Sequence, residues 1–348
     1  MRYRQWAQVR FLLVIAAVGL GLALVSASQG AGAGPSNFDG LHFRLEPPPS
    51  SFTLPPPRAE AATIFGTDDR VRVEDTKAWP YRLVVQLVMF DDADEIVGTC
   101  SGMLVNYNVA LTAAHCLWDD DLGAPFASIL IIPGQDGTEF PFGTGLVTAG
   151  SISIPVGYVD DVDAPIYDFG LAHLVVQDFG PELGPFVPVA SASDDYFHGQ
   201  GTSLFTAGYP GDKPLGTMWE SIAPVEYVDD ELIHTRMDAY PGQSGSPVFT
   251  LNFERVEAFI VGTYSTETAV SNRAVRFSPR HIDALNDYCA DAGCTLSTAI
   301  VAAPTTTAVA SPSPSPTPTA TSTPTPTSTS IPSPSFPVRS RIPHLGRD

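Results

Sequence analysis

The sequence predicts an all-β fold that ends in one short helix. Three observations support this prediction: short apolar or alternating runs recur along the chain, turn residues separate nearly all of them, and β-branched and aromatic residues fill them. The runs are YRLVVQLVMF, TCSGMLV, VALTAAH, SILIIPG, DFGLAHLVV, TSLFTAGYPG, HTRMDAY, GSPVFTL, AFIVGTYS and AVRFS. Many short strands fit a sandwich or a barrel, and the pattern alone does not choose between the two.

One segment, SPRHIDALNDYCADAG, has a helical pattern. Ser278 is a suitable N-cap and Pro279 a suitable first helical residue, because proline's missing N–H costs nothing there. Ile282, Leu285 and Tyr288 fall on one face. We expect this helix to close the domain.

Composition divides the chain into four parts. Residues 1–27 are expected to be a signal peptide, because arginines precede an apolar run and small residues follow it; a membrane anchor is the alternative. Residues 28–62 are rich in Gly, Pro and Ala and are expected to form a propeptide or an extended linker. Residues 63–297 have the size of a single all-β domain. Residues 298–348, rich in Pro, Ser and Thr, are expected to be a disordered tail.

The chain is strongly acidic, with a net charge of -20. Nucleic acid is therefore not an expected partner, because phosphate binding needs a basic surface. Acidic clusters at 91–95, 119–121 and 160–163 lack the ligand spacing of a calcium loop and fit solvated turns better, although calcium binding stays open. We expect no cofactor, a monomer, and membrane contact only through the signal peptide.

Four cysteines in an exported chain allow three disulfide pairings. Cys100 and Cys116 flank two apolar runs joined by an NYN turn, which would bring their sulfurs together. Cys289 and Cys294 enclose ADAG and could close a small loop after the helix. We favour the pairs Cys100–Cys116 and Cys289–Cys294. Zinc is not expected, because the chain has neither CxxC nor HExxH.

Three residues in the chain order His, Asp, Ser could act together in hydrolysis. Serine is a poor nucleophile at neutral pH, so it needs a base and a third group that fixes the tautomer of that base. LTAAHC contains His115, YDFGLAHL contains Asp168 and PGQSGSPVF contains Ser244. Taken singly, the histidine could be a core residue and GQSG an ordinary turn. Asp168 is preferred over the aspartates within 160–163 because it directly precedes an apolar strand.

With these residues in view, the chain resembles the chymotrypsin-like serine proteases, and most closely the bacterial glutamyl endopeptidases. The resemblance implies two antiparallel six-stranded β-barrels with the active site between them. It implies Ser244 as nucleophile, His115 as general base and acid, and Asp168 as the group that orients His115. The N–H groups of Gly242 and Ser244 are expected to form the oxyanion hole. Further matching stretches are IFGTDDRVRVEDTKAWPYR, AGYPGDKPLGTMW, MDAYPGQSGSPVF and SNRAVRF.

Gln243 precedes the expected nucleophile. In trypsin-type enzymes an aspartate at this position pairs with the new N-terminus after zymogen cleavage, and glutamine cannot form that ion pair. Any activation must therefore work differently, and in the glutamyl branch an amide residue is normal here. The resemblance places the start of the mature chain near Ala62–Thr63.

The chain departs from the resembled branch at its specificity residues. Glutamyl endopeptidases bind the substrate carboxylate with a histidine on the strand after the nucleophile and with a hydroxyl residue before it. Here no histidine occurs between residues 234 and 281, and Ala239 occupies the hydroxyl position. Asp238 does not indicate a basic-residue pocket, because the branch also has aspartate there. We expect a specificity that is not strictly for Glu. The residues expected to line the pocket are Ala239, Thr263 and Tyr264, with Ser265 as a further candidate.

The expected function is that of a secreted, extracellular serine endopeptidase that cleaves proteins or peptides through an acyl-enzyme. The first alternative is an inactive protease fold used as a binding or adhesion module on the Ser/Thr/Pro stalk. The His, Asp and Ser residues argue against it, since a binding module needs no nucleophile beside a base. The second alternative is a serine esterase, but the chain lacks a strand–GxSxG–helix elbow.

Overall fold

The computed structural model describes residues 63–177, 179–198, 203–252, 257–267 and 271–301. The expected signal peptide (1–27), the propeptide or linker (28–62) and the tail after residue 301 lie outside these residues. Within the described ranges, no helix has the length and apolar character needed to cross a membrane.

The first half of the fold is an eight-stranded antiparallel sheet with the order β11-β8-β7-β2-β3-β4-β10-β9. β10 and β11 follow one another closely in the chain and pair with β4 and β8, on opposite parts of the sheet. The sheet curls into a half-barrel, whereas a six-stranded barrel was expected. Its strands are β2 (Val84–Phe90), β3 (Ile96–Asn106), β4 (Val109–Thr112), β7 (Ser128–Pro133), β8 (Gly145–Thr148), β9 (Ile152–Ser153), β10 (Gly170–His173) and β11 (Val176–Gln177).

The second half contains a closed barrel of six strands. The order β16-β13-β14-β15-β18-β17 returns to its start because β16 also pairs with β17. All pairs within this barrel are antiparallel, as expected. Its strands are β13 (Ser203–Gly208), β14 (Trp219–Val228), β15 (Leu232–Thr235), β16 (Pro247–Asn252), β17 (Glu257–Glu267) and β18 (Asn272–Arg276).

Short elements connect and extend the two halves. The N-terminal segment of the described region, residues 63–72, ends in β1, which pairs with β14. β5 pairs with β6. The remaining strands are β1 (Val71–Arg72), β5 (Trp118–Asp119), β6 (Ala124–Pro125), β12 (Val189–Ala192) and β19 (Thr298–Val301); the helices are η1 (Tyr81–Leu83), η2 (Ala114–Cys116), α2 (Val156–Asp160), η3 (Pro165–Tyr167), η4 (Pro181–Leu183), α3 (Asp194–Phe197) and α4 (Pro279–Asp291).

One apolar core runs through both halves. It includes Leu87 of β2 together with Phe205 and Phe249 of the closed barrel, all buried. Phe205 lies 5.8 Å from Tyr81 and 5.4 Å from Phe249 between ring centroids, so aromatic side chains bridge the two halves. A second buried cluster joins residues of the closed barrel to residues of β12 and α3. The halves therefore share buried surface and position the residues between them.

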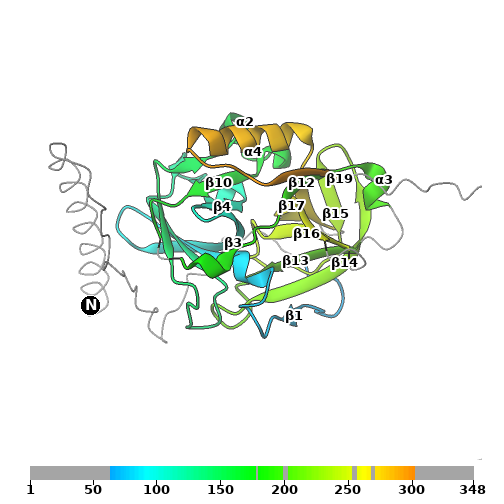
Figure 1. Ribbon diagram of the computed structural model, residues 1–348, viewed down its shortest axis with the longest axis horizontal. Coiled ribbons are helices and arrows are strands. Elements are labelled where there is room, and N and C mark those ends of the chain that lie inside the picture. The colour runs from blue at the N-terminus through cyan, green and yellow to red at the C-terminus, as the bar shows by residue number, and fades with distance from the viewer. Residues whose placement is uncertain (1–62, 178, 199–202, 253–256, 268–270, 302–348) are drawn as a thin grey trace, which may run out of the picture. The chain divides into compact units, whose positions relative to one another are not determined.

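Helix α4 forms where the sequence predicts it, with Ser278 as N-cap and Pro279 as first residue. Figure 1 shows α4 across the top of the molecule, above β10 and β12. Its face carries Leu285, which is fully buried, and Tyr288, which is partly buried. The helix thereby covers both halves.

The folded region continues past residue 297, where composition suggested that the tail begins. Residues Thr298–Val301 form β19, which pairs in parallel with β12. Ala299 and Val301 pack against the second core cluster, because alternate residues of a strand share one face. A short β-branched run therefore adds a strand where the composition appeared tail-like.

Aspartates of two acidic clusters bind the backbone of their own loops. Asp91 Oδ1 accepts the N–H groups of Ala93 and Glu95, both at 2.9 Å. Asp161 Oδ1 accepts the N–H of Asp163 at 3.2 Å. These aspartates cap their own loops, which is the usual reason for aspartate in turns.

The structure joins Cys100 to Cys116 and Cys289 to Cys294, the pairing favoured from the sequence. The first bridge ties β3 to η2, and the second closes the loop after α4.

Replacing both Cys100 and Cys116 by alanine should lower the free energy of unfolding by about 3 kcal/mol, because this bridge constrains a loop with a separation of 16 residues. The matched control replaces Cys289 and Cys294, whose separation of 5 residues predicts a loss of about 2 kcal/mol. Denaturant unfolding measures both losses. A smaller loss for the first pair than for the second would contradict the prediction, as would peptide mapping that joins Cys100 to Cys289 or Cys294.

Candidate active site

His115 lies in η2, directly after β4. The disulfide of the adjacent Cys116 ties this short helix to β3. The side chain of His115 is 11 % exposed, so the imidazole stands at the edge of the core with limited access to solvent.

Strand register brings Asp168 to His115. β10 pairs with β4 so that Gly170 lies opposite Thr112, and Asp168 precedes β10 while His115 follows β4. Asp168 Oδ2 lies 2.8 Å from His115 Nδ1, and Oδ1 accepts the backbone N–H of His115 at 3.0 Å. The two contacts fix both the backbone and the ring of His115.

Asp168 receives a further hydrogen bond from the closed barrel. Ser265 Oγ, on β17, donates to Asp168 Oδ2 at 2.6 Å. Burial alone would raise the pKa of Asp168, but His115 and the hydrogen bonds from His115 and Ser265 outweigh burial and hold the pKa below its ordinary value. An ionised carboxylate only accepts hydrogen bonds, so His115 Nδ1 carries the proton of that contact. In a neutral imidazole, Nε2 is then the basic nitrogen.

Ser244 lies in the loop between β15 and β16, at the junction of the two halves. Its carbonyl accepts the N–H of Ser101, on β3, at 2.8 Å. The next residue, Gly245, has φ +77, and a Cβ there would stand 2.0 Å from Thr112 Oγ1. Only glycine permits this close approach to the segment that leads into His115. The structure thus brings the Ser244 loop against the strand ends that carry His115 and Asp168.

The peptide group before Gly242 has a defined orientation. Gly211 N–H donates to the carbonyl of Pro241 at 2.8 Å. In a trans peptide the N–H points away from the carbonyl, so the N–H of Gly242 is directed away from Gly211. Gly242 has φ +100, and a Cβ there would stand 2.6 Å from the carbonyl of Tyr209. Glycine is therefore required for both its conformation and its lack of a side chain.

Ser101 holds this loop through its side chain as well. Ser101 Oγ donates to the carbonyl of Gly242 at 2.7 Å and accepts the N–H of Tyr209 at 2.8 Å. Ser101 is fully buried. The sequence did not indicate a role for Ser101, and Ser265 was expected only as a pocket residue. Each contacts the site from a distant part of the chain, which local sequence patterns do not reveal.

The expected specificity residues present few hydrogen-bond donors. Ala239 is buried and apolar, and Thr263 is fully buried. Tyr264 is buried, and its hydroxyl donates to the carbonyl of Met237 at 2.9 Å. Arg273 neighbours Ala274, which lies opposite Tyr264, so the pleat directs Arg273 to the other face of the sheet.

Two other polar residues near these positions are engaged elsewhere. Asp238 accepts the N–H groups of Phe65 and Asp69 at 2.7 and 3.0 Å, so its charge faces the N-terminal segment. His234 contacts Asp229 at 3.1 Å and Ser271 at 3.3 Å through its two ring nitrogens.

One group of potential metal ligands comes together among the described residues, formed by Cys100, His115 and Cys116. The two sulfurs are joined in the disulfide and are not thiolates, the form in which cysteine binds metal. The group therefore offers one imidazole nitrogen, which does not make a metal site.

Comparison with known proteins identifies the domain that contains this arrangement. The family profile of the trypsin-like peptidase domain matches residues 100–256, a range that includes His115, Asp168 and Ser244. Over residues 100–256 the chain is therefore similar to the trypsin-like peptidase domain. The half-barrel and the closed barrel, which extend beyond this range on both sides, together form a chymotrypsin-like fold.

Individual relatives are similar to this chain over somewhat more than half of its length. A glutamyl endopeptidase of Bacillus licheniformis is 33 % identical over 193 residues, which are 56 % of each chain. A protein of Bacillus subtilis named extracellular metalloprotease is 33 % identical over 192 residues, 55 % of this chain and 58 % of the relative. The chain thus spans somewhat more than half the length of these relatives. A solved structure of a Glu endopeptidase in complex with MPD superposes with a TM-score of 0.55 at 23 % identity, over 65 % of this chain and 98 % of the other, and supports the fold.

Helix α4 contacts the loop before Asp168 through His281. His281 Nδ1 lies 3.2 Å from the N–H of Ser278 and 2.8 Å from Ser278 Oγ, while Nε2 lies 3.1 Å from the carbonyl of Ile166. A neutral ring that accepts at Nδ1 and donates at Nε2 fits these partners. Burial lowers the pKa of His281 below its usual value, and the charge of Arg280 adds to this effect, although the bond to Ile166 opposes it.

His281→Gln should make stability less dependent on pH. Because the pKa is lower in the folded protein than in the unfolded chain, the unfolded chain binds the proton more strongly. Stability from this residue is therefore lost as pH falls below the unfolded value of 6.5 towards the lower folded value. Between pH 7 and 5, the free energy of unfolding of the wild type should fall more steeply, by up to about 1.4 kcal/mol per pH unit. Groups common to both proteins cancel in the difference, so equal slopes would contradict this assignment.

Proposed function

We propose that this chain is a secreted serine endopeptidase in which Ser244, His115 and Asp168 act as a catalytic triad. The observation that best supports the proposal is the 2.8 Å contact between His115 Nδ1 and Asp168 Oδ2, at the junction where the Ser244 loop meets β3 and β4. A histidine that is oriented by a buried, ionised carboxylate and lies beside a serine loop has the geometry required of a general base in acyl transfer.

In the first step, Ser244 Oγ attacks the carbonyl carbon of the scissile peptide bond. His115 Nε2 takes the hydroxyl proton as the new C–O bond forms, and the carbonyl oxygen becomes an oxyanion. Asp168 stabilises the imidazolium and keeps its ring in place. The N–H groups of Gly242 and Ser244 are proposed to donate to the oxyanion.

In the second step, the C–N bond breaks and His115 returns the proton to the leaving amine, which leaves an ester on Ser244. Water then attacks this ester and gives its proton to His115, and a second oxyanion forms in the same place. Collapse of this intermediate returns the proton to Ser244 Oγ and releases the carboxylic acid. The atoms and protons balance without a cofactor.

Substrate preference is proposed not to be strict for Glu. A carboxylate that met Ala239 and Tyr264 would find a methyl group and a phenol whose hydrogen is donated to Met237. An anion buried without donors is costly, and the acidic surface adds unfavourable charge. The similarity to glutamyl endopeptidases therefore supports the proposed reaction, peptide hydrolysis, more strongly than it supports a preference of this chain for Glu before the scissile bond.

Export and processing are part of the proposal. The composition of residues 1–27 supports a signal peptide, and one relative is named extracellular. Residues 28–62 would form a propeptide or linker, with a mature start near Thr63, and the Ser/Thr/Pro-rich segment after residue 301 would form the tail.

Ser244→Ala and His115→Ala should each lower kcat towards a suitable peptide by several powers of ten, about 10⁴–10⁶, and the double variant should lose little more, because the residues act as one unit. Steady-state kinetics on a peptide found by library screening, with reaction towards a fluorophosphonate, measures this loss. Near-normal hydrolysis by Ser244→Ala would disprove the assignment. A wild type that neither hydrolyses peptides nor reacts with the reagent would favour the inactive binding module.

For a pair of peptides that differ only by Glu or Gln before the scissile bond, the kcat/KM ratio should stay below about 100. One charge-assisted hydrogen bond is worth about 1.5–3 kcal/mol, or about one to two powers of ten in rate, and two expected donors are missing. The ratio should be unchanged in Tyr264→Phe, because the lost hydroxyl donates to Met237. It should rise when Ala239→Thr and Tyr264→His are combined. A wild-type ratio above about 100 would mean that another donor binds the carboxylate.

A further inference from the structure

A buried arginine lies beside the proposed oxyanion hole without a role in the steps above. Arg70 belongs to the N-terminal segment just before β1, and its side chain is 0 % exposed. A buried cation is costly unless it is paired and hydrogen-bonded. The partners of Arg70 therefore indicate what this residue holds in place.

The guanidinium uses all five of its N–H donors. Nε and Nη2 donate to the two oxygens of Asp68, both at 2.9 Å. The second hydrogen of Nη2 and one hydrogen of Nη1 bind the two oxygens of Asp212, and the last hydrogen of Nη1 binds Gln243 Oε1 at 3.2 Å. A guanidinium has five donors in a fixed planar arrangement, so this set of partners specifies arginine and leaves no donor unused.

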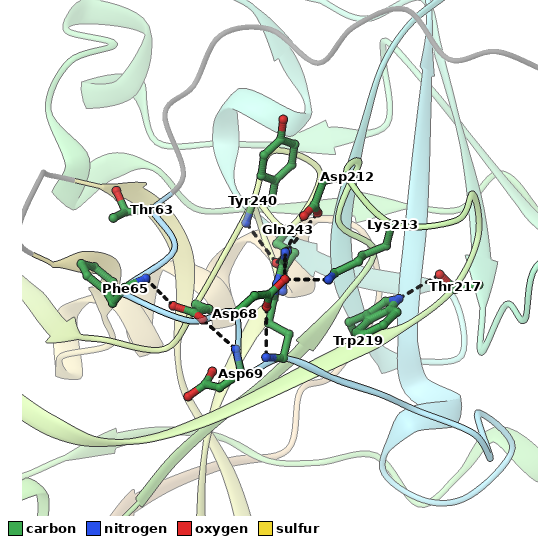
Figure 2. A network of polar contacts seen from close by, with 12 residues as sticks. Thr63, Phe65, Asp68, Asp69, Asp212, Lys213, Thr217, Trp219, Tyr240 and Gln243 are labelled. Atoms are coloured by element: carbon green, nitrogen blue, oxygen red, sulfur yellow. Dashed lines mark hydrogen bonds and ion pairs between the residues drawn. The ribbon is translucent and has the colours of Figure 1, made fainter. Parts of the chain in front are cut away.

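The charge of Arg70 is paired with two carboxylates, those of Asp68 and Asp212. The hydrogen bond from Arg70 holds the pKa of Asp68 well below its usual range, and burial opposes this only in part. Burial would lower the pKa of Arg70, but hydrogen bonds to Asp68 and Asp212 raise it overall. Lys213 adds a contact of 2.6 Å to Asp68, and its ammonium stands 4.3 Å from the ring centre of Trp219. Figure 2 shows Lys213 linked to Asp68, and Gln243 linked to the backbone nitrogen of Tyr240.

Two paths lead from Arg70 to the loop that carries the oxyanion donors. In the first, Gln243 Oε1 also accepts the N–H of Tyr240 at 3.0 Å, so Arg70 fixes a side chain that braces the start of the loop. In the second, Asp212 follows Gly211, whose N–H orients the carbonyl of Pro241. The first path ends at Tyr240 and Gln243, and the second ends at the peptide group before Gly242.

The segment that carries Arg70 is itself anchored to the same loop region. The N–H groups of Phe65 and Asp69 bind the two oxygens of Asp238, which is buried. The carbonyl of Thr63 accepts the side-chain amide of Asn272 at 2.9 Å. These contacts fix the backbone on which Arg70 stands.

We propose that Arg70 is a positioning residue for the oxyanion hole, which it holds in shape through Gln243 and the Asp212 turn. The N-terminal segment thereby becomes a structural part of the active site, through an interior side chain. This inference rests on the proposed peptidase function. The contact also gives the neutral Gln243, which precedes the proposed nucleophile, a structural role: its amide oxygen accepts the remaining N–H of the buried Arg70.

The test compares Arg70→Lys with Arg72→Lys. Lysine keeps the charge but has three donors and cannot bind Asp68, Asp212 and Gln243 in one plane. Arg72 lies two residues further along and makes an exposed ion pair with Asp136, so its variant controls for the substitution itself. Gln243→Met is the second variant; it removes the acceptor, keeps the side-chain volume and leaves the contacts of Arg70 with Asp68 and Asp212.

We expect kcat to fall about 10–100-fold in Arg70→Lys and in Gln243→Met, less than the 10²–10³-fold loss typical of a deleted oxyanion donor. KM and the pH at half-maximal kcat should stay close to wild type, because substrate contacts and the His115–Asp168 pair are untouched. The double variant should lose no more than the worse single variant, since both act through one path. Arg72→Lys should retain wild-type kcat.

Hydrogen exchange of the peptide segment 238–246 separates this inference from the proposed function. Exchange should be faster in Arg70→Lys and Gln243→Met than in Arg72→Lys, whether or not the wild type hydrolyses peptides. An active wild type with Arg70→Lys kcat within about threefold of the control, or with unchanged exchange in this segment, would overturn the positioning role. An inactive wild type would overturn the peptidase proposal, and with it the catalytic consequence of the Arg70 contacts.

Discussion

The hydrogen bonds of Ser101 are the interaction on which the geometry of the candidate site depends. Its backbone N–H binds Ser244, its hydroxyl binds Gly242, and its carbonyl accepts Thr112 Oγ1 at 2.7 Å. Thr112 ends β4 just before His115, and the neighbouring Cys100 is bridged to Cys116. One fully buried residue of β3 therefore sets the relative position of the serine loop and the histidine helix. Two of its three partners on these segments are backbone atoms, which leaves little freedom for either segment to shift alone.

Buried carboxylates in this acidic chain are each matched to several donors. Asp168 accepts from His115 and Ser265, and Asp238 accepts from two backbone N–H groups of the N-terminal segment. The two aspartates thus have different partners: Asp168 orients the ring of His115, and Asp238 holds the backbone of residues 65–69. Their difference lies in the donors that face them, since a buried carboxylate without hydrogen-bond donors is costly.

The sequence predicted those features that depend on neighbouring residues. Helix α4 begins at its predicted cap, and Asp168 stands where an apolar strand begins, opposite the strand that leads to His115. The partners of this pair were not predictable, because Ser265 is 97 residues from Asp168 in the chain and Gln243 is 173 residues from Arg70. In the sequence, Arg70 follows two aspartates and resembles an exposed charged turn. The open pairing of the first sheet and the strand β19 likewise depend on contacts that no local pattern encodes.

The N-terminal segment contacts both the loop before Ser244 and, through Asn272 and Met237, the surroundings of Tyr264. The carbonyl of Thr63 accepts the side-chain amide of Asn272, and that amide also binds the carbonyl of Met237, which takes the hydroxyl hydrogen of Tyr264. A histidine in place of Tyr264 would present an N–H to a substrate carboxylate, whereas the one hydroxyl hydrogen of Tyr264 is donated to the backbone carbonyl of Met237. Further along the segment, Arg70 braces the loop that precedes Ser244. Residues 63–72 are thus connected both to Tyr264 and to the loop before Ser244. A change in how that segment binds would alter the positions of Met237 and Tyr264 together with that of the loop that carries Ser244.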